Sequence, residues 1–180
     1  MYPQDGGITI RAGAQASVLC GASRPGHFDG VLKVVTKLFH LVEPTRVYFG
    51  QKDAQQLAII ETLVRDYNFP LEVRRVPTVR ETDGLAKSSR NVFLSEEERQ
   101  EAPSIHQAIQ LGLNHYKEHQ NIEEAKKVTA QHIENGTSGN IDYVELLSYP
   151  DLTKDISSAT SVILAVAVFF EKARLIDNMM

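Results

Sequence analysis

Residues 46–76 read RVYFGQKDAQQLAIIETLVRDYNFPLEVRRV, with a short strand-like run at each end and a longer segment between them. We predict a short apolar strand at 46–49 and a second strand at 71–76. The middle segment repeats apolar residues at the spacing of one helix face: Leu57, Ile60, Leu63, Val64 and Tyr67. Strand, helix and strand in this order predict a βαβ unit and a parallel sheet.

The preceding residues continue this alternation of strand and helix. The alternating residues 8–10 predict a short strand. Apolar residues then recur at helical spacing to about residue 42, with Asp29 as the expected N-cap and Pro44 ending the helix. The first half of the chain therefore predicts an α/β fold.

Helix signals continue in the second half. Ser95 followed by Glu98 forms a capping box, which predicts a helix start, and Pro103 predicts a break in that helix. Asn121 begins a further helix by the same pattern of a cap followed by acids.

Three strand-like runs follow these helices, at 141–147, 161–170 and 173–177. Only two residues separate the last two runs, so we predict that they form a hairpin. The second half therefore predicts a small α+β domain with an antiparallel sheet. We place the domains at residues 1–86 and 87–180.

The composition excludes several classes of protein. A net charge of -4 over 180 residues does not provide the basic face that nucleic-acid binding usually needs, so we expect no nucleic-acid partner. The longest apolar run, 162–170, is too short to cross a bilayer as a helix, and residues 1–7 show no signal peptide. A single cysteine allows no disulfide within the chain, which suits a reducing compartment. We expect a cytoplasmic protein without a membrane partner.

The first candidate site lies where the strand 46–49 passes into the following helix. Backbone N–H groups and the helix dipole attract anions at such a helix N-terminus. Gly50 allows a ligand to approach the backbone, Lys52 adds a positive charge, and Asp53 can accept hydrogen bonds from ribose hydroxyls. The alternative is an ordinary helix start, with Asp53 as N-cap and Lys52 in solvent.

The second candidate site is the polar stretch 83–91. Ser88 and Ser89 are flanked by Lys87 and Arg90, so two hydroxyls and two cations lie together. Such groups stabilise the negative charge that develops as pyrophosphate leaves, and we interpret the stretch as a mobile phosphate clamp. The alternative is a polar loop between domains.

Four stretches together resemble a known family. RPGHFDGV at 24–31, YFGQKDAQQL at 48–57, VRETDGLAKSSRN at 79–91 and ARLIDN at 173–178 resemble pantothenate synthetases in order and spacing, and the match covers essentially the whole chain. The resemblance implies a truncated Rossmann-like nucleotidyltransferase sheet followed by the small C-terminal domain. It also implies ligation of pantoate to β-alanine with ATP and Mg²⁺, through a pantoyl adenylate, with release of AMP and pyrophosphate. The parent enzyme is expected to be a homodimer.

The resemblance also implies roles for particular residues. It assigns ATP binding to Gly50, Gln51, Lys52, Asp53, Val79, Lys87, Ser88, Ser89 and Arg90. Lys52, Ser88, Ser89 and Arg90 are the expected catalytic residues within this set. Gln56 is expected to hydrogen-bond pantoate, and Arg24 and His27 are placed near the pantoate pocket, with a structural role for their loop as the alternative. No metal ligand is assigned to the chain.

The resemblance also identifies family features that are absent. The 180 residues contain no His-x-Gly-His motif, whose histidine is the family's expected catalytic group, and they lack its early glutamine. Residues 1–3 match a point well inside the family pattern, so roughly the first third is expected to be missing. We therefore expect the parent protein to be the ligase and this chain alone to have little or no activity. The alternatives are another adenylyltransferase, or a noncatalytic fragment that binds nucleotide or serves in assembly.

Overall fold

The computed structural model describes residues 1–2 and 7–180, so most of the stretch inspected for a signal peptide lies outside the described residues. The chain forms two compact units. The first comprises Met1–Phe49 and Gln55–Val76, and the second comprises Gly50–Ala54 and Pro77–Met180. Residues 77–86, which the sequence analysis placed in the first domain, therefore pack with the second unit.

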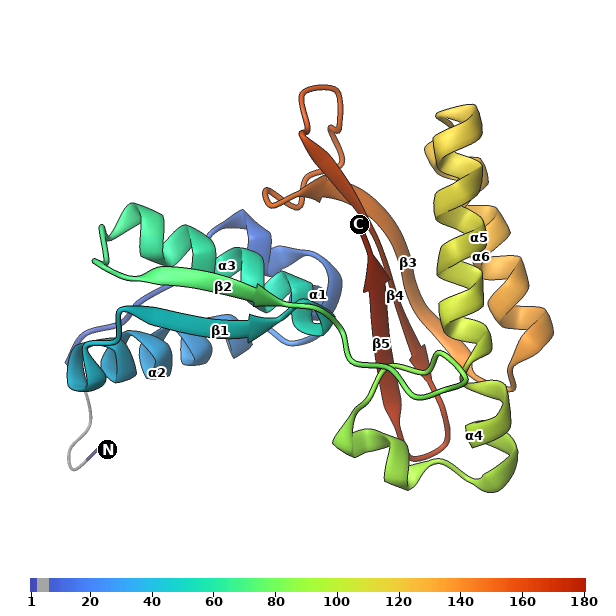
Figure 1. The fold of residues 1–180 in the computed structure, drawn as a ribbon, viewed down its shortest axis with the longest axis horizontal. Helices are drawn as coiled ribbons and strands as arrows, with labels where there is room; N and C mark the ends of the chain where they lie inside the picture. The colour runs from blue at the N-terminus through green and yellow to red at the C-terminus, as the bar shows by residue number, and fades with distance from the viewer. Residues whose placement is uncertain (3–6) are drawn as a thin grey trace. The chain divides into compact units, whose positions relative to one another are not determined.

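The first unit contains the βαβ arrangement that the sequence predicts. Strands β1 (Arg46–Gly50) and β2 (Glu72–Val76) lie side by side and run in the same direction (Figure 1), and helix α3 (Ala54–Asp66) connects them. Helix α2 (His27–Val42) adds a second helix. Apolar side chains of both helices form one buried core: Phe28, Leu32, Phe39, Ile59, Ile60 and Leu63. Short turns η1 (Ala14–Ser17) and α1 (Leu19–Ser23) precede α2.

Two predictions for the start of the chain are wrong. Residues 8–10 form no strand, because three alternating residues lack a paired neighbour to hydrogen-bond with. The N-cap of α2 is Gly26, in the left-handed region at φ 76°, rather than Asp29. The Asp29 carboxylate lies in the first turn of the helix and accepts a hydrogen bond from the backbone N–H of Ala12 at 2.8 Å.

The second unit contains an antiparallel sheet in the order β3 (Asn140–Tyr149), β4 (Ser161–Phe169), β5 (Arg174–Met179). This confirms the predicted C-terminal hairpin. Helices α4 (Glu96–Glu101), α5 (Ser104–His119) and α6 (Ile122–Gly136) complete the unit, and side chains of α5 and α6 share a buried core with the sheet. Since β5 pairs only with β4 in this sheet, it is an edge strand.

The helix starts of the second unit follow their predicted caps. The Ser95 hydroxyl accepts from the backbone of Glu98, whose carboxylate accepts from the backbone of Ser95, so the capping box is complete. Pro103 separates α4 from α5, and the Asn121 side chain caps α6. No helix in the described part of the chain combines the length and the apolar character needed to cross a membrane.

Candidate functional site

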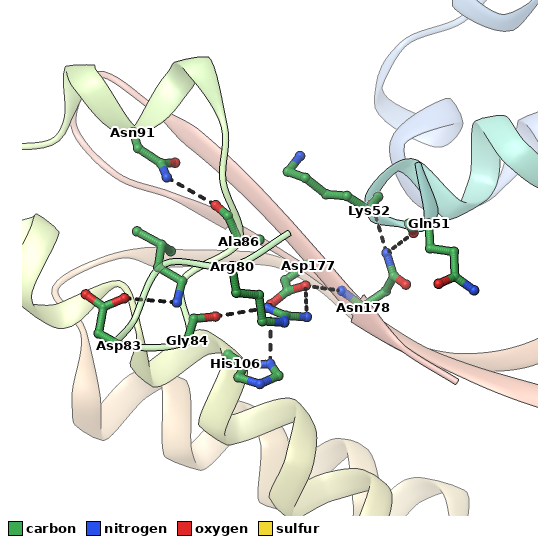
Figure 2. Close-up of polar contacts among 11 residues, drawn as sticks. Gln51, Lys52, Arg80, Asp83, Gly84, Ala86, Asn91, His106, Asp177 and Asn178 are labelled. Carbon is green, nitrogen blue, oxygen red and sulfur yellow. Dashed lines mark hydrogen bonds and ion pairs between the residues drawn. The ribbon is translucent and has the colours of Figure 1, made fainter. Parts of the chain in front are cut away.

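The turn between β1 and α3 is held by the edge strand β5. This turn is the 3-10 helix η2 (Gln51–Asp53). The side-chain amide of Asn178 donates to the carbonyl oxygens of Gln51 and Lys52, at 3.0 and 2.8 Å (Figure 2). Lys52 is half-buried and Asp53 is exposed. Gly50 has an extended backbone at φ -72°, and no described atom lies within 4 Å of where its Cβ would be, so open space adjoins the turn.

Residues 79–87 form a narrow loop closed by backbone hydrogen bonds. The N–H of Lys87 donates to the carbonyl of Val79 at 2.9 Å, and the N–H of Glu81 donates to the carbonyl of Leu85 at 2.8 Å. Gly84 has φ 94°, a backbone conformation that favours glycine, and it forms the tip of the loop. The loop ends at Lys87, where the predicted phosphate-binding residues begin.

Arg80 fastens this loop to β5. Its guanidinium donates to both carboxylate oxygens of Asp177, at 2.6 and 2.9 Å, and to the carbonyl of Gly84 at 3.0 Å. Asp177 is only 5% exposed, and it also accepts from the backbone N–H of Asn178 at 2.8 Å. Figure 2 shows that the interactions run without a break from the loop through β5 to η2.

His106 lies beside this ion pair on α5. Its Nδ1 is 3.7 Å from Asp177 and has no hydrogen-bond partner among the described residues. Burial lowers the pKa of His106, and the positive charge of Arg80 lowers it further, whereas the carboxylate of Asp177 raises it. The neutral imidazole is therefore favoured next to the Arg80 guanidinium.

The predicted phosphate-binding residues follow the loop. The Ser88 hydroxyl accepts from the backbone N–H of Arg90 at 3.2 Å and so caps the 3-10 helix η3 (Ser89–Phe93). Lys87 is exposed, with its amine 3.4 Å from the carboxylate of Glu81. Ser89 and Arg90 are also exposed, although the Arg90 guanidinium donates to a carbonyl of β5 at 3.4 Å. The side chains of Lys87, Ser89 and Arg90 are accessible to a ligand.

The second unit brings the two candidate sites together. Lys52 and Ser88 line one recess, whose free volume of about 10 Å³ accommodates about one water molecule. The other lining residues are Leu85, Ala86, Asn91, Ile105 and residues 174–177 of β5. Gln51 borders a larger groove of about 280 Å³ that is also lined by Thr78, Arg80 and residues 178–180. The η2 turn therefore borders both hollows, and Lys52 and Ser88 both line the smaller one.

The remaining predicted site residues lie elsewhere. Gln56 is half-buried on the first turn of α3, in the first unit. Arg24 is exposed before α2, and His27 begins that helix with its ring 5.0 Å from the ring of Phe28. Val79 is 61% exposed at the start of the loop in the second unit.

Sequence reasoning missed the polar residues that hold the site. Asp177 and Asn178 were noticed only as part of a family-like ending, and Arg80 only as part of a motif. Both residues are buried in β5, where polar side chains need hydrogen-bond partners, but their burial is not visible in the sequence. Gln55 was also missed: its buried amide donates to the carbonyls of Gln15 and Val18 at 2.8 and 2.6 Å.

Metal-ligating residues do not gather in the described part of the chain. No group of three or more histidine, cysteine, aspartate or glutamate side chains is arranged there to hold a metal ion.

Comparison with known proteins identifies similar chains. The family model for pantoate-beta-alanine ligase matches residues 1–180. The chain is 64% identical to a pantothenate synthetase of Lysinibacillus sphaericus, over 99% of this chain and 63% of that protein. It is 53% identical to the pantothenate synthetase of Bacillus subtilis, over 99% of this chain and 62% of that one.

Solved structures give the same result. A pantothenate synthetase from Thermus thermophilus superposes with a TM-score of 0.91 at 40% identity, over 99% of this chain and 65% of that one. A pantoate-beta-alanine ligase from Francisella tularensis, described as complexed with beta-gamma ATP and beta-alanine, gives 0.70 at 29% identity, over 96% and 58%. The chain thus spans less than two thirds of the length of each of these relatives.

Proposed function

Because the chain belongs to the pantoate–β-alanine ligase family, we propose that the protein contributes to the ATP-dependent joining of pantoate and β-alanine to give pantothenate. The observation that carries the proposal is that Lys52 and Ser88, from two separate segments, line one recess of the second unit. The Francisella relative, which is described as complexed with beta-gamma ATP and beta-alanine, supports the same substrates.

The proposed reaction has two steps. A carboxylate oxygen of pantoate attacks the α-phosphorus of ATP, and pyrophosphate leaves with the electron pair of the broken P–O bond. The β-alanine amine then attacks the acyl carbon of pantoyl adenylate, loses a proton, and displaces AMP. Because the substrate supplies the nucleophile, the protein contributes mainly orientation and charge stabilisation.

The roles proposed for Lys52 and residues 87–90 use where these residues lie, and the remaining roles are those that the family resemblance implies. Lys52 adds positive charge at the recess, and Ser88 supplies a hydroxyl there. Lys87, Ser89 and Arg90 are exposed and can reach the departing pyrophosphate. Gly50, Gln51, Asp53 and Val79 are assigned to the nucleotide, Gln56 to pantoate, and Arg24 and His27 to the surroundings of pantoate.

The proposal includes Mg²⁺ bound to the nucleotide phosphates. When bound, the ion neutralises phosphate charge. The proposal assigns recognition of this complex to its phosphates and ribose, with Lys52 and Arg90 as the cationic contacts. The proposal also includes a homodimeric, cytoplasmic enzyme, which sedimentation analysis and cell fractionation test.

The decisive experiment follows oxygen from pantoate. The enzyme at its natural length is supplied with ATP, β-alanine and pantoate labelled with ¹⁸O in the carboxylate. Transfer of one label to AMP is expected, because the adenylate is cleaved at the bond between the acyl carbon and the oxygen. Formation of ADP and phosphate, or unlabelled AMP, would contradict the adenylate route. ATP binding without pantothenate formation would favour a nucleotide-binding module.

Substitutions in the recess connect this activity to the structure. Lys52→Met and Ser88→Ala are each expected to lower kcat/KM by about 10²-fold or more, as loss of one preorganised donor does elsewhere. Lys126→Met is the matched control, because Lys126 pairs with Glu145 on β3 and lines neither hollow. Equal activity of Lys52→Met and the control would refute the assignment of the recess.

A further inference from the structure

We propose that Asp177 and Asn178 of β5 are positioning residues that hold two phosphate-binding segments, residues 51–53 and 87–90, in one arrangement. This inference rests on the proposed function and adds to it two residues that need not touch the substrate. Their side chains are 5% and 8% exposed, and each is hydrogen-bonded to one of the two segments or to the loop that leads into it.

Asn178 fixes the first segment. Its amide donates to two consecutive carbonyls, those of Gln51 and Lys52. In a trans peptide the N–H lies opposite the C=O, so the next N–H groups, of Lys52 and Asp53, point away from Asn178. Holding the two carbonyls therefore fixes the direction of the N–H groups that a phosphate would bind, as well as the start of the Lys52 side chain.

Asp177 fixes the second segment through Arg80. The guanidinium fork is bound to both carboxylate oxygens, which sets the position and orientation of Arg80. Arg80 pairs through its backbone with Ala86 in an antiparallel bridge, and Ala86 directly precedes Lys87. The Asn91 side chain also donates to the Ala86 carbonyl, at 3.1 Å. The entry to residues 87–90 is therefore anchored to Asp177.

Adjacent residues of one strand make both connections. Successive side chains of a strand point to opposite faces, so neighbours can hold segments on two sides. Asp177 and Asn178 are in register with Val166 and Ala165 of β4, which keeps this part of the edge strand paired. The backbone N–H of Asn178 also donates to the Asp177 carboxylate, which ties the Asp177 side chain to the backbone of the next residue.

Geometry explains this network better than stability does. A buried ion pair generally contributes little more to stability than well-packed apolar residues of the same size. It does fix orientation, and small errors in the placement of reacting groups lower rates strongly. Asn178 has both amide hydrogens committed to backbone carbonyls, so it acts on a ligand through Gln51 and Lys52.

The test compares ligands with and without phosphates, using the enzyme at its natural length. Asn178→Asp keeps the size of the side chain but replaces the donating amide with an oxygen that repels the Gln51 and Lys52 carbonyls. Arg80→Lys keeps the charge but loses the two-pronged contact with Asp177. Calorimetry is used to measure binding of pyrophosphate, ATP, adenosine and pantoate, and steady-state kinetics give KM and kcat.

Both variants are expected to bind pyrophosphate and ATP about tenfold or more weakly, while adenosine affinity stays within about twofold. The KM for ATP should rise, and the KM for pantoate should not change. Ser148→Ala is the control, because Ser148 is 3% exposed and accepts from the backbone N–H of Thr153 at 3.0 Å, outside both segments. This control should leave all affinities unchanged even where it lowers the unfolding temperature.

Two results would overturn the inference. One is pyrophosphate affinity within about twofold of wild type in both variants, and the other is a parallel loss of adenosine, pantoate and pyrophosphate binding. If Asn178→Asp does not fold, the milder Arg80→Lys decides by the same criteria. Wild-type enzyme that binds pyrophosphate but forms no pantothenate counts against the proposed function alone, since the pyrophosphate comparison still decides the positioning role.

Discussion

Replacing Arg80 with methionine tests how strongly the second unit depends on the ion pair with Asp177. The substitution removes two hydrogen bonds, at 2.6 and 2.9 Å, from a carboxylate whose residue is 5% exposed. Removing one partner of a buried ion pair costs about 3–5 kcal/mol. Because the Arg80 side chain keeps 20% exposure, we expect a loss of about 3 kcal/mol in the free energy of unfolding, at the lower end of that range.

The pH dependence of this loss identifies its cause. The pKa of His106 is lowered in the folded protein, first by burial and then by the charge of Arg80, so its stabilising contribution is present above about pH 6.5 and is lost as the pH falls below that value. Methionine removes one of the lowering causes and leaves Asp177 to attract the imidazolium. The pKa of His106 therefore rises in the variant, and the stability deficit becomes smaller at about pH 5.5 than at about pH 8.

Urea unfolding followed by circular dichroism at both pH values measures the deficit, and NMR titration of His106 measures its pKa. Lys126→Met is the control, since its 3.0 Å pair with Glu145 has side chains 24% and 28% exposed. That variant should lose less than about 1 kcal/mol, equally at both pH values. A deficit below about 1 kcal/mol for Arg80→Met, or one that does not change with pH, would refute the reasoning.

Three substitutions test packing elsewhere. Gly112→Ala should destabilise the protein by about 1–3 kcal/mol, because a Cβ would lie 1.8 Å from the Thr129 hydroxyl, although alanine favours helices. Gly30→Ala, with nothing within 4 Å of its Cβ, should instead stabilise helix α2 by about 0.5–1 kcal/mol in the same urea assay. Gln55→Leu removes the donor to the carbonyls of Gln15 and Val18 and should speed hydrogen exchange around α1, while protection of the second unit stays unchanged.

Local patterns predicted most of the fold because local contacts decide it. The Ser95 capping box and the Asn121 cap act within three residues, and both are present. The apolar spacing at 46–76 identified strand, helix and strand because α3 buries one face and Val47, Phe49 and Val73 of the two strands pack partly buried against the same core. The strand at 8–10 failed because strand formation depends on a distant partner, which three alternating residues do not specify.

The candidate site was predicted only in part, for the same reason. The cations and hydroxyls that suit phosphate chemistry are visible in the sequence, at Lys52 and residues 87–90. Their supports are not visible, since Arg80 meets Asp177 across 97 residues and Asn178 meets Lys52 across 126. Contacts at such separation follow from the register of β5 in its sheet, and no periodicity in the sequence encodes that register.

The arginine and lysine side chains near the two hollows differ in whether a carboxylate of the protein already neutralises their charge. Arg80 is bound by both oxygens of Asp177, and Arg174 lies 2.6 Å from the carboxylate of Asp142. A ligand that drew Arg80 away would leave the buried Asp177 carboxylate without its partner, which is costly, and one that drew Arg174 away would break its ion pair with Asp142. These two arginines are therefore fixed to the scaffold and are poorly suited to bind a phosphate that arrives and leaves.

The cations with weak partners or none are Lys52, Lys87 and Arg90, which the resemblance assigns to ATP. Lys87 has one exposed ion pair at 3.4 Å, and exposed pairs contribute little. Arg90 makes one long contact, and Lys52 makes no ion pair among the residues that the structure describes. Phosphate can bind these groups without breaking a structural interaction. The division between anchoring arginines and available cations supports phosphate binding at this face independently of the resemblance, because it depends only on which charges are already neutralised.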